Sequence, residues 1–108
     1  MSSDIPESDW RRFKEVHTEL LERYCRRILE EIAAAGRKGN GTAHERYLEI
    51  YKIIEERDRD LARVFNDFRR STAAIQLGLM RRMNLLTDEE LSRFSEPTRT
   101  RIEAIASL

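Results

Sequence analysis

The chain has 108 residues, a mass of 12.8 kDa, and 20 basic and 20 acidic residues that give a formal net charge of zero. Its length fits a single domain, and its hydrophobic fraction of 40% is too high for a wholly disordered chain. Four glycines and two prolines supply too little turn chemistry for an all-β fold. One cysteine excludes an intramolecular disulfide and a multi-cysteine zinc site.

The N-terminal segment, residues 1–8, is acidic and has no apolar core of the kind that a signal peptide carries. We expect this segment to be disordered or loosely ordered. The chain also has no run of about 18 apolar residues, which a membrane-spanning helix would need. These features predict a cytoplasmic protein that does not contact a membrane.

A first long helix is predicted from Asp9 to Ala35, with Ser8 as its N-cap. Its apolar residues recur at steps of three and four, and Trp10, Leu21 and Ile32 are spaced by eleven. Eleven residues over three turns is close to the natural helix period, so the stripe suits a nearly straight helix. The segment 36–41 holds three of the four glycines, which end this helix.

A second long helix is predicted from Ala43 to Arg70, beginning at a capping box of Thr42 and Glu45. Two helices of equal length joined by six residues favour an antiparallel hairpin over residues 9–70.

The hairpin turn is expected near Gly39, so the numbers of two facing residues add up to about 78. In this register Trp10 faces Phe68 and Tyr24 faces Ile54, with the aromatic residues gathered at the open end. Residues 71–108 are predicted to form short helices, one of which opens at a capping box of Thr87 and Glu90.

Such a hairpin has too little interior to bury all the aromatic and aliphatic side chains of the chain. The segment 71–108 can fold back over one end of the hairpin but cannot cover its whole length. A second copy would complete the core, so the predicted fold is all-α: a coiled-coil-like hairpin with short C-terminal helices that dimerises into a four-helix core. A monomer with its tail wrapped across the hairpin is the competing prediction, and the C-terminal helices could pack on either chain.

Six consecutive charged residues, 55–60, cover the whole circumference of the second helix, so one of them must face the core. Arg57 or Asp58 is the expected residue, within about one turn of His17 in the predicted register. One interpretation is a structural polar layer of His17, Arg57 and Asp58 that fixes register and partner choice. The other is a buried functional site, although one histidine and one carboxylate make a poor catalytic set.

No catalytic residue, metal ligand or cofactor-binding residue is predicted. His17 and His44 would lie too far apart in the hairpin to share a metal ion, and the Glu-x-x-His pattern of di-iron bundles is absent. Cys25 lies beside the apolar stripe, where packing is the expected role. The loop around Arg37 and Lys38 is either a hairpin tip or an anion-binding element near a helix start.

The segment 68–87 is a basic block, with Arg69, Arg70, Arg81, Arg82 and no acid. Arg70 and Arg81 would lie three turns apart on one side of a helix, a spacing that could follow phosphates. Residues 69–83 contain no aromatic side chain for base stacking. The four arginines are therefore a candidate surface for a partner or an anion, with nucleic acid as the alternative.

Five short strings resemble a family of small uncharacterised proteobacterial proteins, and the resemblance covers most of residues 10–95. They are Trp10-x-x-Phe13-Lys14-Glu15-Val16, Ala43-His44-Glu45-Arg46-Tyr47-Leu48, Arg57-Asp58-x-x-Leu61-Ala62, Phe68-Arg69-Arg70-Ser71-Thr72-Ala73 and Leu85-Leu86-Thr87-x-Glu89-Glu90-Leu91. The resemblance implies an all-helical protein and brings no catalytic or binding residue with it.

The sequence as a whole predicts a non-catalytic helical interaction or scaffold protein that acts as a homodimer and has an unidentified protein partner. The alternative is a small nucleic-acid-associated regulator that uses the basic segment 68–87.

Overall fold

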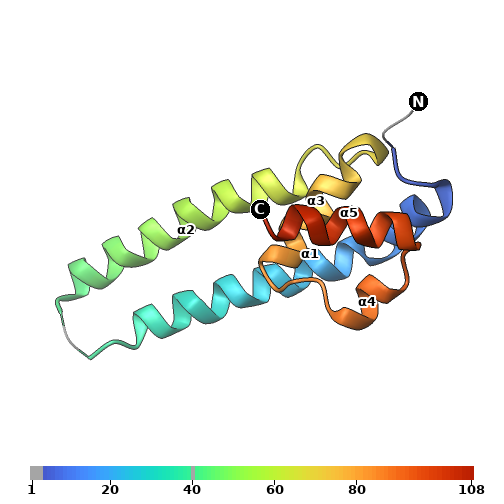
Figure 1. Cartoon of the computed structure of the whole chain (residues 1–108). Helices are drawn as coiled ribbons and strands as arrows, with labels where there is room; N and C mark the ends of the chain where they lie inside the picture. The colour runs from blue at the N-terminus through green and yellow to red at the C-terminus, as the bar shows by residue number, and fades with distance from the viewer. Residues whose placement is uncertain (1–3, 40) are drawn as a thin grey trace.

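The computed structural model describes residues 4–39 and 41–108, and every regular element within them is helical. The elements are α1 (Glu7–Gly36), α2 (Ala43–Phe65), the 3₁₀ turn η1 (Arg70–Thr72), α3 (Ala73–Arg82), α4 (Asp88–Ser92) and α5 (Glu96–Ala106). Figure 1 shows α1 and α2 as an antiparallel hairpin, with the short helices gathered around its open end. The molecule measures 56 × 25 × 24 Å. The helical elements and their hairpin arrangement confirm the predicted all-α hairpin fold.

The start of α1 is better ordered than predicted. The helix begins at Glu7 after Pro6, and no side chain caps it, so the prediction that Ser8 is its N-cap is wrong. Ile5 is only 1% exposed, and its carbonyl accepts a hydrogen bond from Arg70 Nε at 2.7 Å. The expectation of a loose segment therefore fails for residues 4–8, because Ile5 fills part of the core; residues 1–3 lie outside the described chain.

The end of α2 corrects the prediction that this helix continues to Arg70. It stops at Phe65 because Asn66 is extended and Asp67 takes a left-handed backbone conformation with φ 58°. Asn and Asp tolerate this conformation better than other non-glycine residues. The Thr72 hydroxyl donates to the Asp67 carbonyl at 2.6 Å, which holds the chain in a sharp turn before α3.

The hairpin register differs from the predicted one by about three helical turns. Tyr24 packs against Phe65, with ring centroids 6.1 Å apart, and not against Ile54. Lys38 pairs with Glu49 in the same shifted register. The loop runs on beyond the end of α1 before the chain turns (Figure 1), so α2 begins farther out than a symmetric turn near Gly39 would place it.

The predicted contact between Trp10 and Phe68 is present, with ring centroids 4.9 Å apart. It forms for a different reason from the one expected. Phe68 lies in the turn after α2, which folds back over the start of α1, and it also packs against Phe13 at 5.2 Å. The aromatic side chains therefore gather at the open end of the hairpin, as predicted.

The C-terminal helices pack on their own hairpin and close its open end. Helices α3 and α5 cross so tightly that a Cβ atom on Gly78 would lie 2.4 Å from Ile105 Cγ2. Helix α4 begins at the predicted capping box, in which Thr87 accepts from the Glu90 amide and Glu90 accepts from the Thr87 amide. The core formed in this way joins fully buried residues from the open end of the hairpin and from the C-terminal segment: Ile5, Phe13, Leu20, Val64, Leu77, Met80, Leu85 and Ile102.

Candidate interaction surface

The structure does not assemble the predicted polar layer. Arg57 does face α1, as one residue of the charged run must, and donates to both carboxylate oxygens of Glu31 at 2.9 and 3.1 Å. The hydrogen bonds from Arg57 lower the pKa of Glu31. Asp60 adds a further contact to Arg57 at 3.2 Å, whereas Asp58 is exposed on the outer side of α2.

His17 lies in a separate aromatic environment at the open end. Its ring stacks on Phe68 with centroids 3.7 Å apart and meets the edges of Phe13 and Phe65. Its Nε2 atom is buried and has no hydrogen-bond partner among the described residues, and burial lowers the pKa of the imidazole. Arg57 instead pairs with Glu31, which is roughly 21 Å along α1 from His17 at ~1.5 Å per residue. The predicted grouping with Arg57 and Asp58 is therefore wrong, because the register is shifted.

The four arginines of the basic segment point to partners within the chain. Arg69 pairs with Asp67 at 2.6 Å, and Arg70 pairs with Glu7 at 3.1 Å. Arg81 pairs with Asp88 and Glu103, while Arg82 donates to the carbonyls of Ile105 and Ala106. Arg70, Arg81 and Arg82 therefore join separate elements of the fold, whereas the Arg69 pair lies within one turn. This arrangement weakens its assignment as a partner or anion surface.

A buried carboxylate at the start of α1 has a role that sequence reasoning missed. Asp9 is 2% exposed and accepts hydrogen bonds from the Ser95 amide at 2.9 Å, the Ser95 hydroxyl at 2.6 Å and the Thr98 hydroxyl at 2.5 Å. It thus caps α5 from 86 residues away in sequence. The sequence did indicate a helix start at Ser95-Glu96-Pro97, but it did not show that Asp9 of α1 would accept the hydrogen bonds at this start.

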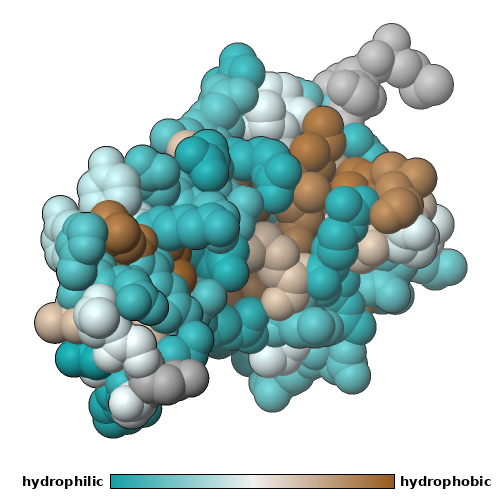
Figure 2. Space-filling view, turned by 90° about the vertical axis from the view of Figure 1, so that its left-hand side faces the viewer, coloured by the Kyte–Doolittle hydropathy of each residue, from teal (hydrophilic) through white to brown (hydrophobic). Residues whose placement is uncertain are grey.

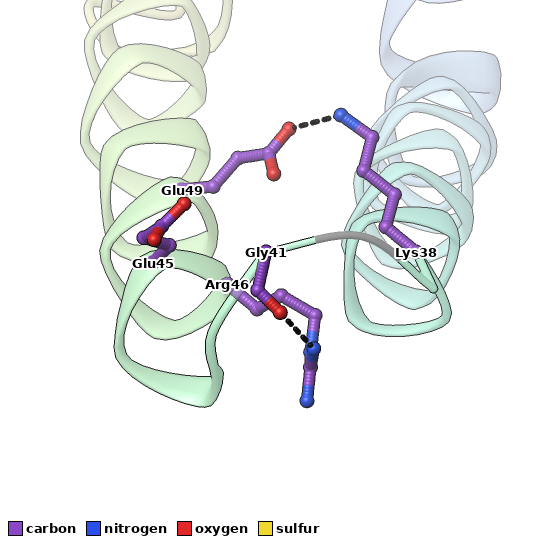
Figure 3. Close-up of a pocket in the computed structure, with 5 residues that line it drawn as sticks. All are labelled: Lys38, Gly41, Glu45, Arg46 and Glu49. Atoms are coloured by element: carbon purple, nitrogen blue, oxygen red, sulfur yellow. Dashed lines mark hydrogen bonds and ion pairs between the residues drawn. The ribbon is translucent and has the colours of Figure 1, made fainter.

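A shallow hollow of about 230 Å³ lies at the tip of the hairpin. In Figure 3, Lys38 reaches from the end of α1 across to Glu49 on α2, a distance of 2.7 Å, and Arg46 donates to the carbonyl of Gly41 at 3.1 Å. Both cationic side chains that line the hollow are therefore engaged within the chain. The geometry favours the hairpin-tip interpretation of this loop over anion binding.

The hairpin tip and the outer side of α2 carry exposed apolar side chains. Figure 2, which looks onto the tip, shows hydrophobic side chains emerging in patches between hydrophilic ones. Four large residues share one side of α2, at spacings of one, three and four, and we call them the α2 patch: Tyr47, Leu48, Tyr51 and Ile54, which are 62%, 49%, 56% and 48% exposed. Tyr51 lies roughly 100–120° around the helix from Ile50 and Arg57, which face α1. The side of α2 that faces α1 is half-buried at Ile50 and Arg57, and the α2 patch lies about a third of a turn around from it and stays exposed.

Within the described residues, no group of three or more His, Cys, Asp or Glu side chains is placed to hold a metal ion. Cys25 is a free, partly buried thiol on α1. None of the described helices is both long and apolar enough to span a bilayer.

No family model, curated protein or solved structure matches the chain. The resemblance to small proteobacterial proteins therefore stays a prediction.

Proposed function

We propose that this protein is a non-catalytic helical interaction module that acts as a homodimer. The observation that carries the proposal is the α2 patch. Large apolar side chains seldom gather on one exposed helix side unless that side meets a partner. The C-terminal helices are committed to the opposite end of the hairpin and do not cover this side.

Two further observations support an interaction role over the alternatives. The polar side chains suggested for a functional site are separated, since His17 is enclosed by aromatic rings and Arg57 is paired with Glu31. The arginines suggested for nucleic-acid binding brace the fold internally. A role as a binding scaffold uses the apolar surface that the fold leaves exposed on the distal half of α2.

Light scattering on the purified chain at micromolar concentration tests the proposal. The expected mass is twice 12.8 kDa, with dissociation on dilution. A mass of 12.8 kDa at every concentration would contradict the homodimer.

A further inference from the structure

We propose that the α2 patch docks against the α2 patch of a second copy, with the two α2 helices antiparallel and a twofold axis passing beside Tyr51. The inference rests on the proposed homodimer and specifies its surface and orientation. In the resulting assembly the two hairpins meet through their α2 helices, on the side that lies about a third of a turn around from α1.

The spacing of residues about Tyr51 supports this arrangement. An antiparallel twofold axis at Tyr51 pairs each residue with the one equally far along the helix in the other direction. Leu48 and Ile54 lie three residues before and after Tyr51, so Leu48 of one copy meets Ile54 of the other. The central turns of the interface are thus apolar on both copies.

The polar side chains flanking the patch can form hydrogen bonds under the same symmetry. His44 lies seven residues before Tyr51 and Asp58 seven after it, and all three share one side of α2 because seven residues span about two turns. The axis therefore places His44 against Asp58 of the second copy, and it places the Tyr47 hydroxyl near Glu55 of that copy. Among the described residues, neither Glu55 nor Asp58 forms an ion pair within its own chain.

A parallel pairing of the same helices is disfavoured. It would set Glu55 against Glu55 and Asp58 against Asp58, and like charges in register oppose association. The antiparallel pairing replaces both repulsions with hydrogen-bonding contacts. The avoidance of like charges thus selects the orientation, and the apolar residues select the surface.

The available area is suited to a small, reversible dimer. At about 200 Å² for a fully exposed aromatic side chain, Tyr47 and Tyr51 together offer roughly 240 Å². Leu48 and Ile54 add roughly 120 Å², which brings the patch to about 360 Å² of the ~800 Å² that each partner gives to a standard interface. The polar side chains flanking the patch must supply the rest, so we expect a dissociation constant in the micromolar range.

Disulfide trapping tests the orientation, in a background in which Cys25 is replaced by serine. Tyr51→Cys is expected to cross-link to itself. When Leu48→Cys and Ile54→Cys chains carrying tags of different mass are mixed, they are expected to cross-link to each other in preference to their own kind. Preferential self-linking of each single variant would indicate a parallel pairing and overturn the inference.

Substitution at the centre of the patch tests the surface. Tyr51→Glu is expected to raise the dissociation constant about 30-fold or more, because it buries two carboxylates at the centre of the interface. Tyr51 is 56% exposed, so helicity measured by circular dichroism should be unchanged. Ile75→Glu is the matched control, since Ile75 is 55% exposed but lies on α3, and it should leave the dimer intact.

The outcomes separate the two proposals. A dimer that survives Tyr51→Glu and does not trap at position 51 would overturn the inference while leaving the homodimer standing. A chain that stays monomeric at every concentration would overturn both.

Discussion

Replacing Asp9 by asparagine should destabilise the fold although the side chain keeps its shape. The carboxylate accepts three hydrogen bonds from Ser95 and Thr98. A hydrogen bond to a charged group contributes about 1.5–3 kcal/mol and one between neutral groups about 0.5–1.5 kcal/mol. The amide also turns a donor towards groups that need an acceptor. Part of the loss is offset because a buried charge is removed, so we expect a net loss of about 2 kcal/mol in the free energy of unfolding.

The pH dependence provides a second measure of the same contact. Burial raises the pKa of Asp9, but the hydrogen bonds from Ser95 and Thr98 and the charge of Arg99 outweigh it and hold this pKa below its ordinary value of 3.8. The Asp9 carboxylate is therefore protonated at a higher pH in the unfolded chain than in the folded one. The stabilisation that Asp9 provides is fully present above pH 3.8 and is lost as the pH falls through the lower pKa of the folded state.

Urea and thermal unfolding followed by circular dichroism test the Asp9→Asn substitution. A loss of about 2 kcal/mol corresponds to a fall in Tm of about 10 °C for a domain of this size. The variant should also lose the part of the acid sensitivity that arises from Asp9. Glu30→Gln, an exposed carboxylate on the same helix, is the control and should change little. An Asp9→Asn variant as stable as the parent would show that the hydrogen bonds from Ser95 and Thr98 to Asp9 do not stabilise the fold.

Three further predictions concern a close helix contact, a buried histidine and an ion pair. Gly78→Ala should cost about 3 kcal/mol because its methyl group would lie 2.4 Å from a side-chain carbon of α5, whereas Gly39→Ala, with nothing within 4 Å, should be nearly neutral in urea unfolding. Burial lowers the pKa of His17, so its contribution to the free energy of unfolding is complete above about pH 6.5 and declines below it. His17→Phe should therefore reduce the change in the urea midpoint between about pH 7.5 and about pH 5.5. An unchanged pH dependence of the midpoint would contradict this. Hydrogen bonds from Arg23 lower the pKa of Glu90 to about 2, so this contact stabilises the fold above pH 4.5 and is lost as the pH falls towards 2. Arg23→Lys should weaken this stabilisation and raise the pKa of Glu90 in an NMR titration. An unchanged pKa of Glu90 would contradict the contact.

Local features of the sequence predicted local structure well. The helix starts at Thr42 and Thr87 follow from side chains that satisfy the free amides of the first turn, which is a contact within four residues. The apolar stripe of α1 likewise predicts a long helix with one buried side. The end of α2 was missed although Asn66 and Asp67 carried the signal, because the apolar pattern continues to Phe68.

The sequence by itself determined the helical hairpin and the buried side of α1, because both depend on a short-range period. It did not determine which part of the apolar stripe of α2 is buried, since Ile54, expected to face Tyr24, is 48% exposed. It could not determine the register: sliding α2 by eleven residues, or three turns, returns nearly the same side of the helix, so Phe65 can replace Ile54 opposite Tyr24 without disturbing the pattern. Only the tertiary structure decided between these registers, through the path of the loop and the pairing of Arg57 with Glu31. It also decided that Asp9 caps α5, since contacts between distant segments leave no periodic trace in the sequence.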